Sequence, residues 1–127
     1  MQYNKSSEDY LETILLLKEK LGEVRSIDIV NETGYTKPSI SVAMKKLREQ
    51  EYILMDSKGY ISLTQKGRDL AENIYTKHRY LKQFFLEIGV DEENATEDAC
   101  KIEHEISDVS FQCIKNHLMA IRKNEVF

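Results

Sequence analysis

The chain has 127 residues, of which 41% are hydrophobic, and a formal net charge of −4 at pH 7. This length allows one domain or two small ones, and the composition is that of an ordinary globular protein. No apolar run approaches the roughly 18 residues of a membrane span, and the N-terminal residues lack the basic-then-apolar order of a signal peptide. We therefore expect a cytoplasmic protein with no membrane partner and with reduced cysteines.

Basic and acidic side chains are unevenly distributed along the chain. Residues 36–68 contain seven basic and three acidic side chains, a net +4, whereas residues 87–108 contain one basic and nine acidic ones, a net −8. A basic segment attracts polyanions and an acidic segment attracts cations. We therefore expect a nucleic-acid contact in the first half of the chain and a cationic ligand in the second half.

The helical spacing of apolar residues predicts three helices in the first half of the chain, followed by a β-hairpin with the turn sequence DSKG. This order of elements is that of a winged helix-turn-helix. The predicted elements are a helix from Tyr10 to Leu21 that stops at Gly22, a short helix capped by Ser26 that ends near Gly34, a helix from about Pro38 to about Gln50, and the strands Ile53–Met55 and Tyr60–Leu63.

In a winged helix-turn-helix the third helix enters the major groove of DNA, and the hairpin reaches toward the backbone. Basic side chains there neutralise phosphates, while hydroxyl and apolar side chains near the start of the helix touch base edges. Winged helices also serve as protein-interaction modules, and lysines on a helix are usually a solvated surface. The candidate DNA contacts are Thr36, Lys37, Pro38, Ser39, Ser41, Val42, Lys45, Lys46, Arg48 and Lys58.

Three more helices are predicted in the second half of the chain. They run from a cap at Thr64 through Ile88 to a stop at Gly89, from about Thr96 to Ile106, and from Ser107 through Ile121. We thus expect a mostly α protein with a small β-hairpin. A winged helix-turn-helix domain would occupy residues 1–70, and an all-helical domain would occupy residues 71–127.

The fifth predicted helix carries three electron-pair donors on one face. Cys100, Glu103 and His104 stand at positions i, i+3 and i+4, within about one helical turn. A single cysteine or histidine is usually structural, as we expect for Cys113 in the core and for His117. Burial of a thiol, a carboxylate and an imidazole together without an ion would leave polar atoms poorly compensated. This cluster therefore favours a metal site.

Potential ligands elsewhere in the chain extend this set. Asp9 and Glu12 stand at i and i+3 on the first helix, and His78 lies on the fourth. An Asp-x-x-Glu pair at a helix start more often interacts only with the helix dipole. Combined with the cluster, however, these oxygen, nitrogen and sulfur donors suit a divalent first-row transition metal, whereas calcium and magnesium prefer oxygen ligands alone.

Six stretches spread over nearly the whole chain resemble the diphtheria toxin repressor family in its two-domain form. This family includes the iron-dependent repressors and the manganese transport regulators. The matching stretches are SSEDYLETI (Ser6–Ile14), KPSIS (Lys37–Ser41), ISLTQKG (Ile61–Gly67), KHRYLKQFF (Lys77–Phe85), GVDEENA (Gly89–Ala95) and EDACKIEHEISD (Glu97–Asp108).

The resemblance implies a homodimeric, metal-activated transcriptional repressor that binds a palindromic DNA operator and controls metal homeostasis genes, such as those for metal uptake. It implies neither enzymatic activity nor a small-molecule substrate. The implied cofactor is Fe(II) or Mn(II), for which Co(II), Zn(II) or Ni(II) can substitute, with one or two ions per subunit. The ligand positions of the family correspond to Asp9, Glu12, His78, Cys100, Glu103 and His104, and the second domain is then the metal-binding and dimerisation domain.

Two ligand positions differ between the branches of the family. Asp9 resembles the manganese regulators, where the iron repressors have a methionine, and Cys100 resembles the iron repressors, where the manganese regulators have a glutamate. A thiolate is softer than a carboxylate, so this set should favour iron, cobalt or zinc over manganese. We expect the ion to link the first helix to the second half of the chain, and so to fix recognition helices that must lie about 34 Å apart on the operator.

The later helices carry more apolar residues than so small a half needs for its own core. We expect some of them to form the homodimer interface and the others to pack within the chain. They are Phe84, Phe85, Ile88, Ile102, Ile106, Ile114, Leu118 and Ile121.

Two alternative functions fit part of the pattern. A winged-helix regulator could hold a permanent structural zinc at the cluster, and removal of that zinc would unfold the chain. A di-metal carboxylate enzyme also combines Glu and His on helices. Such enzymes normally show paired Glu-x-x-His motifs, however, and the sequence contains none.

Overall fold

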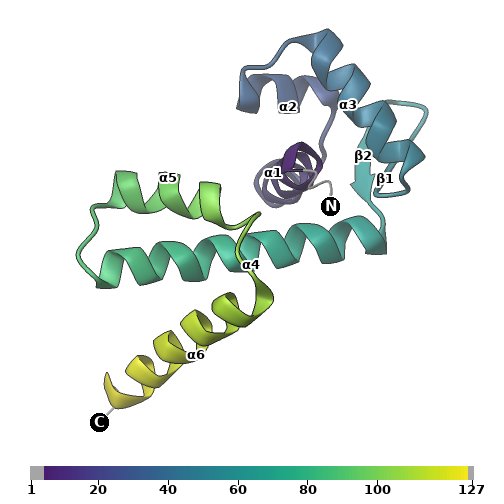
Figure 1. The fold of residues 1–127 in the computed structure, drawn as a ribbon. Helices are drawn as coiled ribbons and strands as arrows, with labels where there is room; N and C mark the ends of the chain where they lie inside the picture. Colours follow the sequence, from purple (N-terminus) through teal and green to yellow (C-terminus); the bar gives the residue numbers. More distant parts are fainter. Residues whose placement is uncertain (1–4, 126–127) are drawn as a thin grey trace. The chain divides into compact units, whose positions relative to one another are not determined.

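The computed structural model describes residues 5–125, with side chains described from residue 7 to residue 121. The elements in chain order are α1 (Lys5–Leu21), α2 (Ser26–Thr33), α3 (Lys37–Glu49), β1 (Ile53–Met55), β2 (Ile61–Leu63), α4 (Gln65–Glu87), α5 (Glu92–Ile102) and α6 (Asp108–Glu125) (Figure 1). This mostly helical architecture with an antiparallel hairpin confirms the predicted fold class. The chain divides after Asn73 into two compact units, and α4 runs from the first into the second. None of the described helices is long and apolar enough to cross a membrane.

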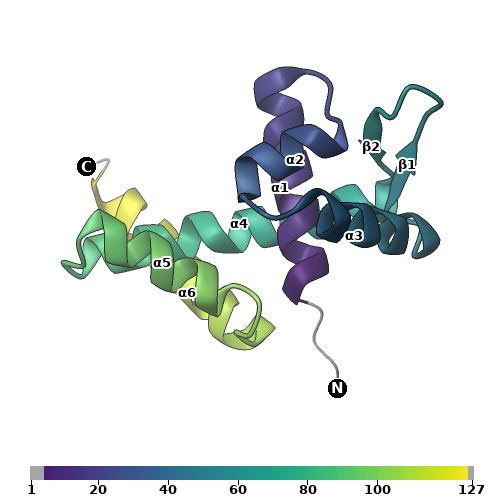
Figure 2. The same ribbon diagram turned by 90° about the horizontal axis from the view of Figure 1, so that it is seen from above.

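The first unit is a winged helix-turn-helix built around one apolar core. α1 packs against α2 and β2, and α3 packs against α2 and β1 (Figure 2). On α3, Ile40, Met44 and Leu47 follow the helical period and are buried, which leaves the opposite face of this helix to solvent. Further buried apolar side chains of this unit include Leu11, Ile14, Val24, Ile29, Ile53 and Ile61.

A short turn joins α2 to α3, as predicted. Gly34 adopts a φ of 76°, and its N–H donates to the carbonyl oxygen of Val30 at 2.8 Å, which ends α2. Thr36 is the N-cap of α3, because its Oγ1 accepts a hydrogen bond from the N–H of Ser39 at 3.2 Å. Pro38 occupies the first turn, where the N–H that it lacks has no helical partner.

The start of α2 differs from the prediction. Ser26 is the first helical residue, and Arg25 is the N-cap. The N–H of Arg25 donates to Asp28 Oδ2 at 2.8 Å, so an acidic side chain of the first turn satisfies this helix end. Just before it, Val24 forms an isolated β-bridge with Ile61, which no local sequence pattern predicts. This bridge ties the connection between α1 and α2 to the hairpin.

The predicted hairpin is confirmed, although β2 begins at Ile61 and not at Tyr60. In the turn, Asp56 Oδ1 accepts hydrogen bonds from the N–H groups of Lys58 and Tyr60, both at 2.9 Å. Gly59 adopts a φ of 85°, which a glycine tolerates without steric cost. This turn places Lys58 in an exposed position at the tip of the hairpin.

Thr64 joins the base of the hairpin to the start of α4. Its hydroxyl donates to the carbonyl oxygens of Glu51 at 2.7 Å and Tyr52 at 3.0 Å. The same Oγ1 accepts from the N–H of Gly67 at 3.1 Å, so the predicted cap is confirmed. Gly67 lies directly against the carbonyl group of Tyr52, where a methyl group has no room.

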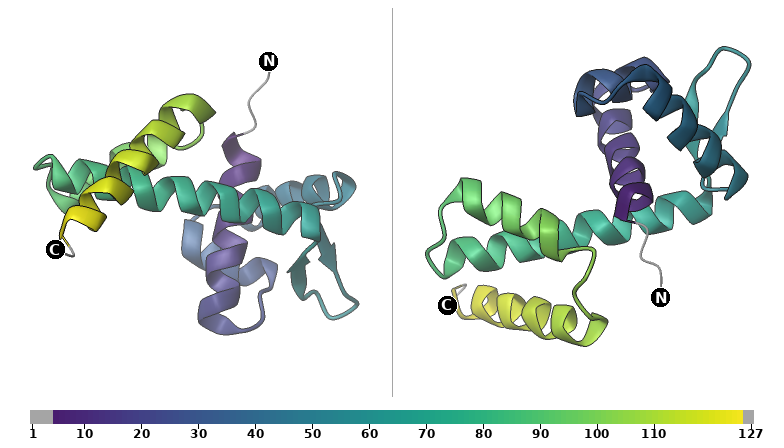
Figure 3. Two further views of the ribbon diagram at one scale, coloured as in Figure 1. Left: turned by 90° about the horizontal axis from the view of Figure 1, so that it is seen from below. Right: turned by 45° about the horizontal axis from the view of Figure 1, so that its top comes forward.

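In the second unit, α5 and α6 lie beside the second half of α4 (Figure 3). Tyr80 of α4 meets Phe111 of α6 edge-on, with ring centroids 6.0 Å apart, and Lys77 Nζ lies 3.6 Å from Asp108 Oδ1. Leu118, one of the candidates for the dimer interface, is only 1% exposed and belongs to the chain's own core. The other buried apolar side chains of this unit include Ile74, Leu81, Ala95 and Ala99.

The bounds of α5 correct the prediction. We expected a helix from Thr96 to Ile106, whereas the helix runs from Glu92 to Ile102. It begins earlier because Asp91 caps it: the Asp91 carboxylate accepts from the N–H of Asn94 at 3.1 Å and from its side-chain amide at 2.8 Å. These hydrogen bonds also lower the pKa of the Asp91 carboxyl.

Candidate functional site

Three potential ligands from two helices meet in the second unit. His78 of α4 and Cys100 of α5 approach each other, with 3.7 Å between His78 Nδ1 and Cys100 Sγ. His78 Nδ1 also lies 2.9 Å from Oε2 of Glu103, the residue that ends α5. One donor atom of each residue lies within 4.8 Å of the others. We call His78, Cys100 and Glu103 the ligand cluster.

His104 adjoins this cluster. The predicted helical spacing of Glu103 and His104 is not observed, because α5 ends at Ile102 and both residues lie in the turn after it. His104 Nε2 is nevertheless 3.3 Å from Glu103 Oε1, and the two side chains are 0% and 1% exposed. Four of the six predicted ligands are thus neighbours in one unit.

The donor set of the cluster fits a transition metal ion. It combines an imidazole nitrogen, a thiol sulfur and a carboxylate oxygen, a mixture that first-row transition metals accept and that calcium and magnesium do not favour. Glu103 Oε1 is buried and accepts no hydrogen bond from the described residues, including His104 at 3.3 Å. A buried carboxylate oxygen with this little compensation is costly unless a cation is nearby.

The same contacts control the protonation of His78. Hydrogen bonds to Cys100, first, and to Glu103 raise the pKa of His78 to about 10, and the partial burial of the ring opposes this rise only in part. In the absence of a metal ion His78 is therefore an imidazolium at neutral pH. A proton on this ring occupies the place that a cation would take among the same partners.

The other two predicted ligands belong to the first unit. Asp9 and Glu12 lie on α1, three residues apart, and therefore project to the same side of that helix. Their convergence with the ligand cluster stays a prediction.

For two side chains of α6 the sequence predicts a structural role. Cys113 was expected in the core, and this was wrong, because Cys113 is exposed. His117 is also exposed. Neither is among the residues of the ligand cluster.

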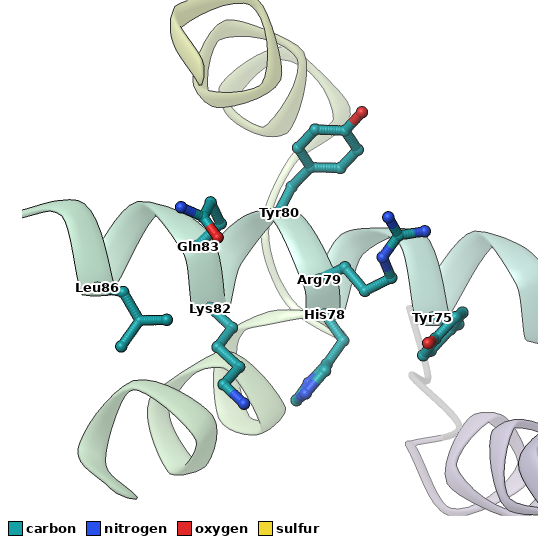
Figure 4. A pocket seen from close by; sticks show the side chains of 7 residues that line it. All are labelled: Tyr75, His78, Arg79, Tyr80, Lys82, Gln83 and Leu86. Carbon is teal, nitrogen blue, oxygen red and sulfur yellow. The ribbon is translucent and has the colours of Figure 1, made fainter. Parts of the chain in front are cut away.

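A surface hollow of about 450 Å³ opens beside His78 on α4 (Figure 4). The side chains of His78 and Lys82 point toward α5, and Tyr80 points toward α6. The hollow leaves 20% of the His78 side chain exposed, so solvent reaches the edge of the ligand cluster. Sequence reasoning did not single out this feature. The lining residues are Tyr75, His78, Arg79, Tyr80, Lys82, Gln83 and Leu86.

All ten candidate DNA contacts are exposed. Lys58 lies at the hairpin tip, and the other nine lie on α3 or at its N-cap. Because the apolar stripe of α3 faces the core, this helix presents a basic and hydroxyl-bearing face to solvent. Val42 lies on that face and is 70% exposed.

Sequence reasoning missed Tyr35, which precedes the N-cap of α3 and is 56% exposed. The available signal was a large aromatic residue in a turn, where small or polar residues are usual. Tyr35 lies beside the candidate contacts Thr36 and Ser39, and with them it lines a hollow on the first unit.

Comparison with known proteins gives matches over nearly the whole chain. Two family models match: the N-terminal DNA binding domain of the iron dependent repressor over residues 3–61, and the iron dependent repressor metal binding and dimerisation domain over residues 64–125. An HTH-type transcriptional regulator of Methanocaldococcus jannaschii is 34% identical over 114 residues, which are 88% of this chain and 91% of that protein. The HTH-type transcriptional regulator MntR of Bacillus subtilis is 35% identical over 102 residues, which are 80% of this chain and 72% of MntR.

Solved structures agree with these matches. The manganese regulator SloR has a TM-score of 0.78 and 31% identity, over 93% of this chain and 54% of SloR. IdeR of T. acidophilum has a TM-score of 0.75 and 26% identity, over 87% of this chain and 53% of IdeR. The chain thus spans about half the length of these solved proteins.

Proposed function

The chain belongs to the iron-dependent repressor family, and on this basis we propose that it is a metal-activated transcriptional repressor that binds a palindromic operator as a homodimer. Its targets are genes of metal homeostasis, in particular those for metal uptake. The observation that carries the proposal is the ligand cluster in one unit of a chain whose other unit presents a basic recognition helix. A di-metal carboxylate enzyme is not the function of this family of transcriptional repressors.

Six residues are the proposed ligands of the ion. His78, Cys100, Glu103 and His104 supply nitrogen, sulfur and oxygen donors from the second unit. Asp9 and Glu12 of α1 complete the set. When bound, a divalent ion supplies two positive charges and directional bonds to these donors.

Cys100 shifts the metal preference of this site. A thiolate is a softer ligand than a carboxylate, so it favours Fe(II), Co(II) or Zn(II) relative to Mn(II). The replacement Cys100→Glu gives an all-nitrogen-and-oxygen set, which suits Mn(II) better.

The DNA-binding residues have two roles. Thr36, Ser39, Ser41 and Val42 lie near the start of α3, where they contact base edges in the major groove. The basic residues contact phosphates, which fixes the position of the protein and makes the affinity dependent on salt. They are Lys37, Lys45, Lys46 and Arg48 on α3, and Lys58 at the hairpin tip.

Dimerisation uses apolar side chains that the second unit leaves exposed. Ile88 is 62% exposed, Val109 is 75% exposed and Met119 is 45% exposed. Burial of such side chains between two subunits stabilises a dimer, and a twofold dimer presents two copies of α3 to the two halves of a palindrome.

Metal and operator binding are coupled because Asp9 and Glu12 belong to the unit that binds DNA. An ion bound to these side chains restricts the motion of α1, which lowers the entropy lost when two recognition helices dock on DNA. Two added positive charges also reduce the repulsion between the acidic chain and the phosphates. By thermodynamic linkage, operator DNA strengthens metal binding by the same factor.

The test is an anaerobic titration of operator DNA with chelator-treated protein, with and without Fe(II), Co(II), Zn(II) or Mn(II). We expect metal to raise operator affinity by about tenfold or more. Glu103→Gln keeps the size of the side chain but removes its charge, and it should abolish this gain. Glu105→Gln, an exposed position two residues further on, is the matched control and should retain the gain. Operator affinity that is independent of all four metals would contradict the proposal.

A further inference from the structure

An aromatic contact within the first unit joins α1 to the turn before α3. The ring centroids of Tyr10 and Tyr35 are 6.1 Å apart and the ring planes are inclined at 76°, which is an edge-to-face arrangement. The quadrupoles of two aromatic rings favour this geometry. The contact therefore gives the first turns of α1 a defined partner in the segment that leads into the recognition helix.

The backbone of Tyr35 is held on both sides. Its N–H donates to Thr33 Oγ1 at 3.2 Å, and the hydroxyl of Thr33 donates to the carbonyl oxygen of Ile29 at 2.7 Å. On its other side, Thr36 begins α3 as the N-cap. The Tyr35 ring is therefore attached to a backbone segment that is anchored at the end of α2 and at the start of α3.

Open space adjoins this contact. Tyr10 and Tyr35 line a hollow of about 410 Å³ together with Gly34, Thr36 and Ser39. Thr36 and Ser39 are among the residues proposed to touch base edges. The start of α3 thus faces a hollow, and the Tyr10–Tyr35 pair lines the same hollow.

Tyr10 also stands between the two proposed ligands of α1. A residue advances by about 100° around a helix, so Tyr10 points about 100° away from Asp9 and about 160° away from Glu12. The ligand-bearing side of α1 and the ring that contacts Tyr35 are thus different sides of the same helical turn. A constraint applied to Asp9 and Glu12 limits the rotation of α1 and with it the position of the Tyr10 ring.

We propose that Tyr10 and Tyr35 are positioning residues that transmit metal occupancy at Asp9 and Glu12 to the first turn of α3. This inference rests on the proposed function. With Asp9 and Glu12 held, the Tyr10 ring is fixed, and Tyr35 and Thr36 are ordered before the operator arrives. The ordering cost of DNA binding is then smaller in the metal-bound state than in the metal-free state.

The test compares operator affinity with and without Co(II) for the wild type, Tyr10→Leu, Tyr35→Leu and the double variant. The quantity of interest is the coupling ratio, which is the metal-free dissociation constant divided by the Co(II)-bound one. Each single variant should lower this ratio by about threefold or more, and the double variant should lower it no further than the larger single effect. Tyr10→Phe and Tyr35→Phe keep both rings and should retain the wild-type ratio.

Two further measurements separate the possible failures. Co(II) affinity without DNA should not be weakened in the Tyr35→Leu variant, because Tyr35 is not a metal ligand. Thermal unfolding should show that this variant is folded, as expected for a side chain that is 56% exposed. A wild-type coupling ratio near one would contradict the proposed function itself. Alternatively, the wild-type ratio is large, Tyr35→Leu leaves this ratio intact, and operator affinity falls equally with and without Co(II). This result would mean that Tyr35 contacts DNA directly, and it would overturn the inference.

Discussion

His78 shows how three side chains determine the chemistry of one site. Its ring nitrogen Nδ1 lies 3.7 Å from Cys100 Sγ and 2.9 Å from Glu103 Oε2, and these contacts raise the pKa of His78 to about 10. The stabilisation from this raised pKa is complete below the ordinary histidine pKa of about 6.5 and is lost as the pH rises through about 10. Metal ions bind only the neutral imidazole, so metal and proton compete for the ring.

Metal binding should therefore release protons at neutral pH. We expect the His78 imidazolium to release one proton for each ion that binds at pH 7. The apparent metal affinity should rise with pH by about tenfold per unit for each proton displaced. Calorimetry in buffers with different ionisation enthalpies measures this number.

The variant His78→Gln is the control for proton release. Its side-chain amide carries no proton that a metal ion displaces, so one proton fewer should be released per ion. Equal proton release by the variant and the wild type would refute this assignment.

At the scale of elements, helix propensity and packing favour different residues at Gly67, where the hairpin joins α4. Gly67 lies in the first turn of α4, where replacement of glycine by alanine normally stabilises a helix by about 1 kcal/mol. Here, however, a methyl group would run into the carbonyl oxygen of Tyr52. The backbone at Tyr52 is itself held by hydrogen bonds to Thr64, so it cannot move aside at low cost.

We expect the packing effect to exceed the helix propensity. Gly67→Ala should destabilise the protein by about 1–3 kcal/mol, the usual cost of an overpacked position. Chemical denaturation followed by circular dichroism measures the change in the free energy of unfolding. Gln65→Ala, at an exposed position of the same turn, should change it by less than about 0.5 kcal/mol. A stabilised Gly67→Ala variant would show that the contact with Tyr52 relaxes easily.

At the scale of the whole molecule, the cores of both units consist mainly of apolar side chains. In the first unit, apolar side chains of α1, α2, α3 and the hairpin supply the buried surface. In the second unit, residues such as Ile74, Leu81 and Leu118 do the same. A protein organised in this way should bind metal as a sensor does, reversibly and from a folded state.

Removal of metal should consequently leave the protein folded. After treatment with a chelator, far-UV circular dichroism should retain the helical signal, and anaerobic addition of Fe(II) or Co(II) should raise the unfolding temperature. At a metal concentration of about 100 times Kd, mass action adds about 2.7 kcal/mol to the stability. Unfolding on chelation, with stoichiometric zinc in the purified protein, would instead indicate a permanent structural zinc site.

Local signals were sufficient for most of the secondary structure. The hairpin turn followed from the DSKG sequence, and the cap at Thr64 and the stop at Gly34 were placed correctly. The start of α5 was missed because its cap, Asp91, lies in an acidic stretch that carries no apolar period of its own. Ser26 was assigned as a cap because serine favours that position, whereas Asp28 satisfies the same helix end from inside the first turn.

The sequence by itself determined the order of the elements, the types of candidate ligands and the solvent-facing side of α3, because these depend on spacing and composition within a few residues. Only the tertiary structure decided that His78 meets Cys100, 22 residues further along the chain, that Gly67 touches Tyr52, and that Tyr10 contacts Tyr35. Such contacts depend on how one element packs against another, and this packing results from many apolar side chains acting together. No short stretch of sequence determines this packing by itself.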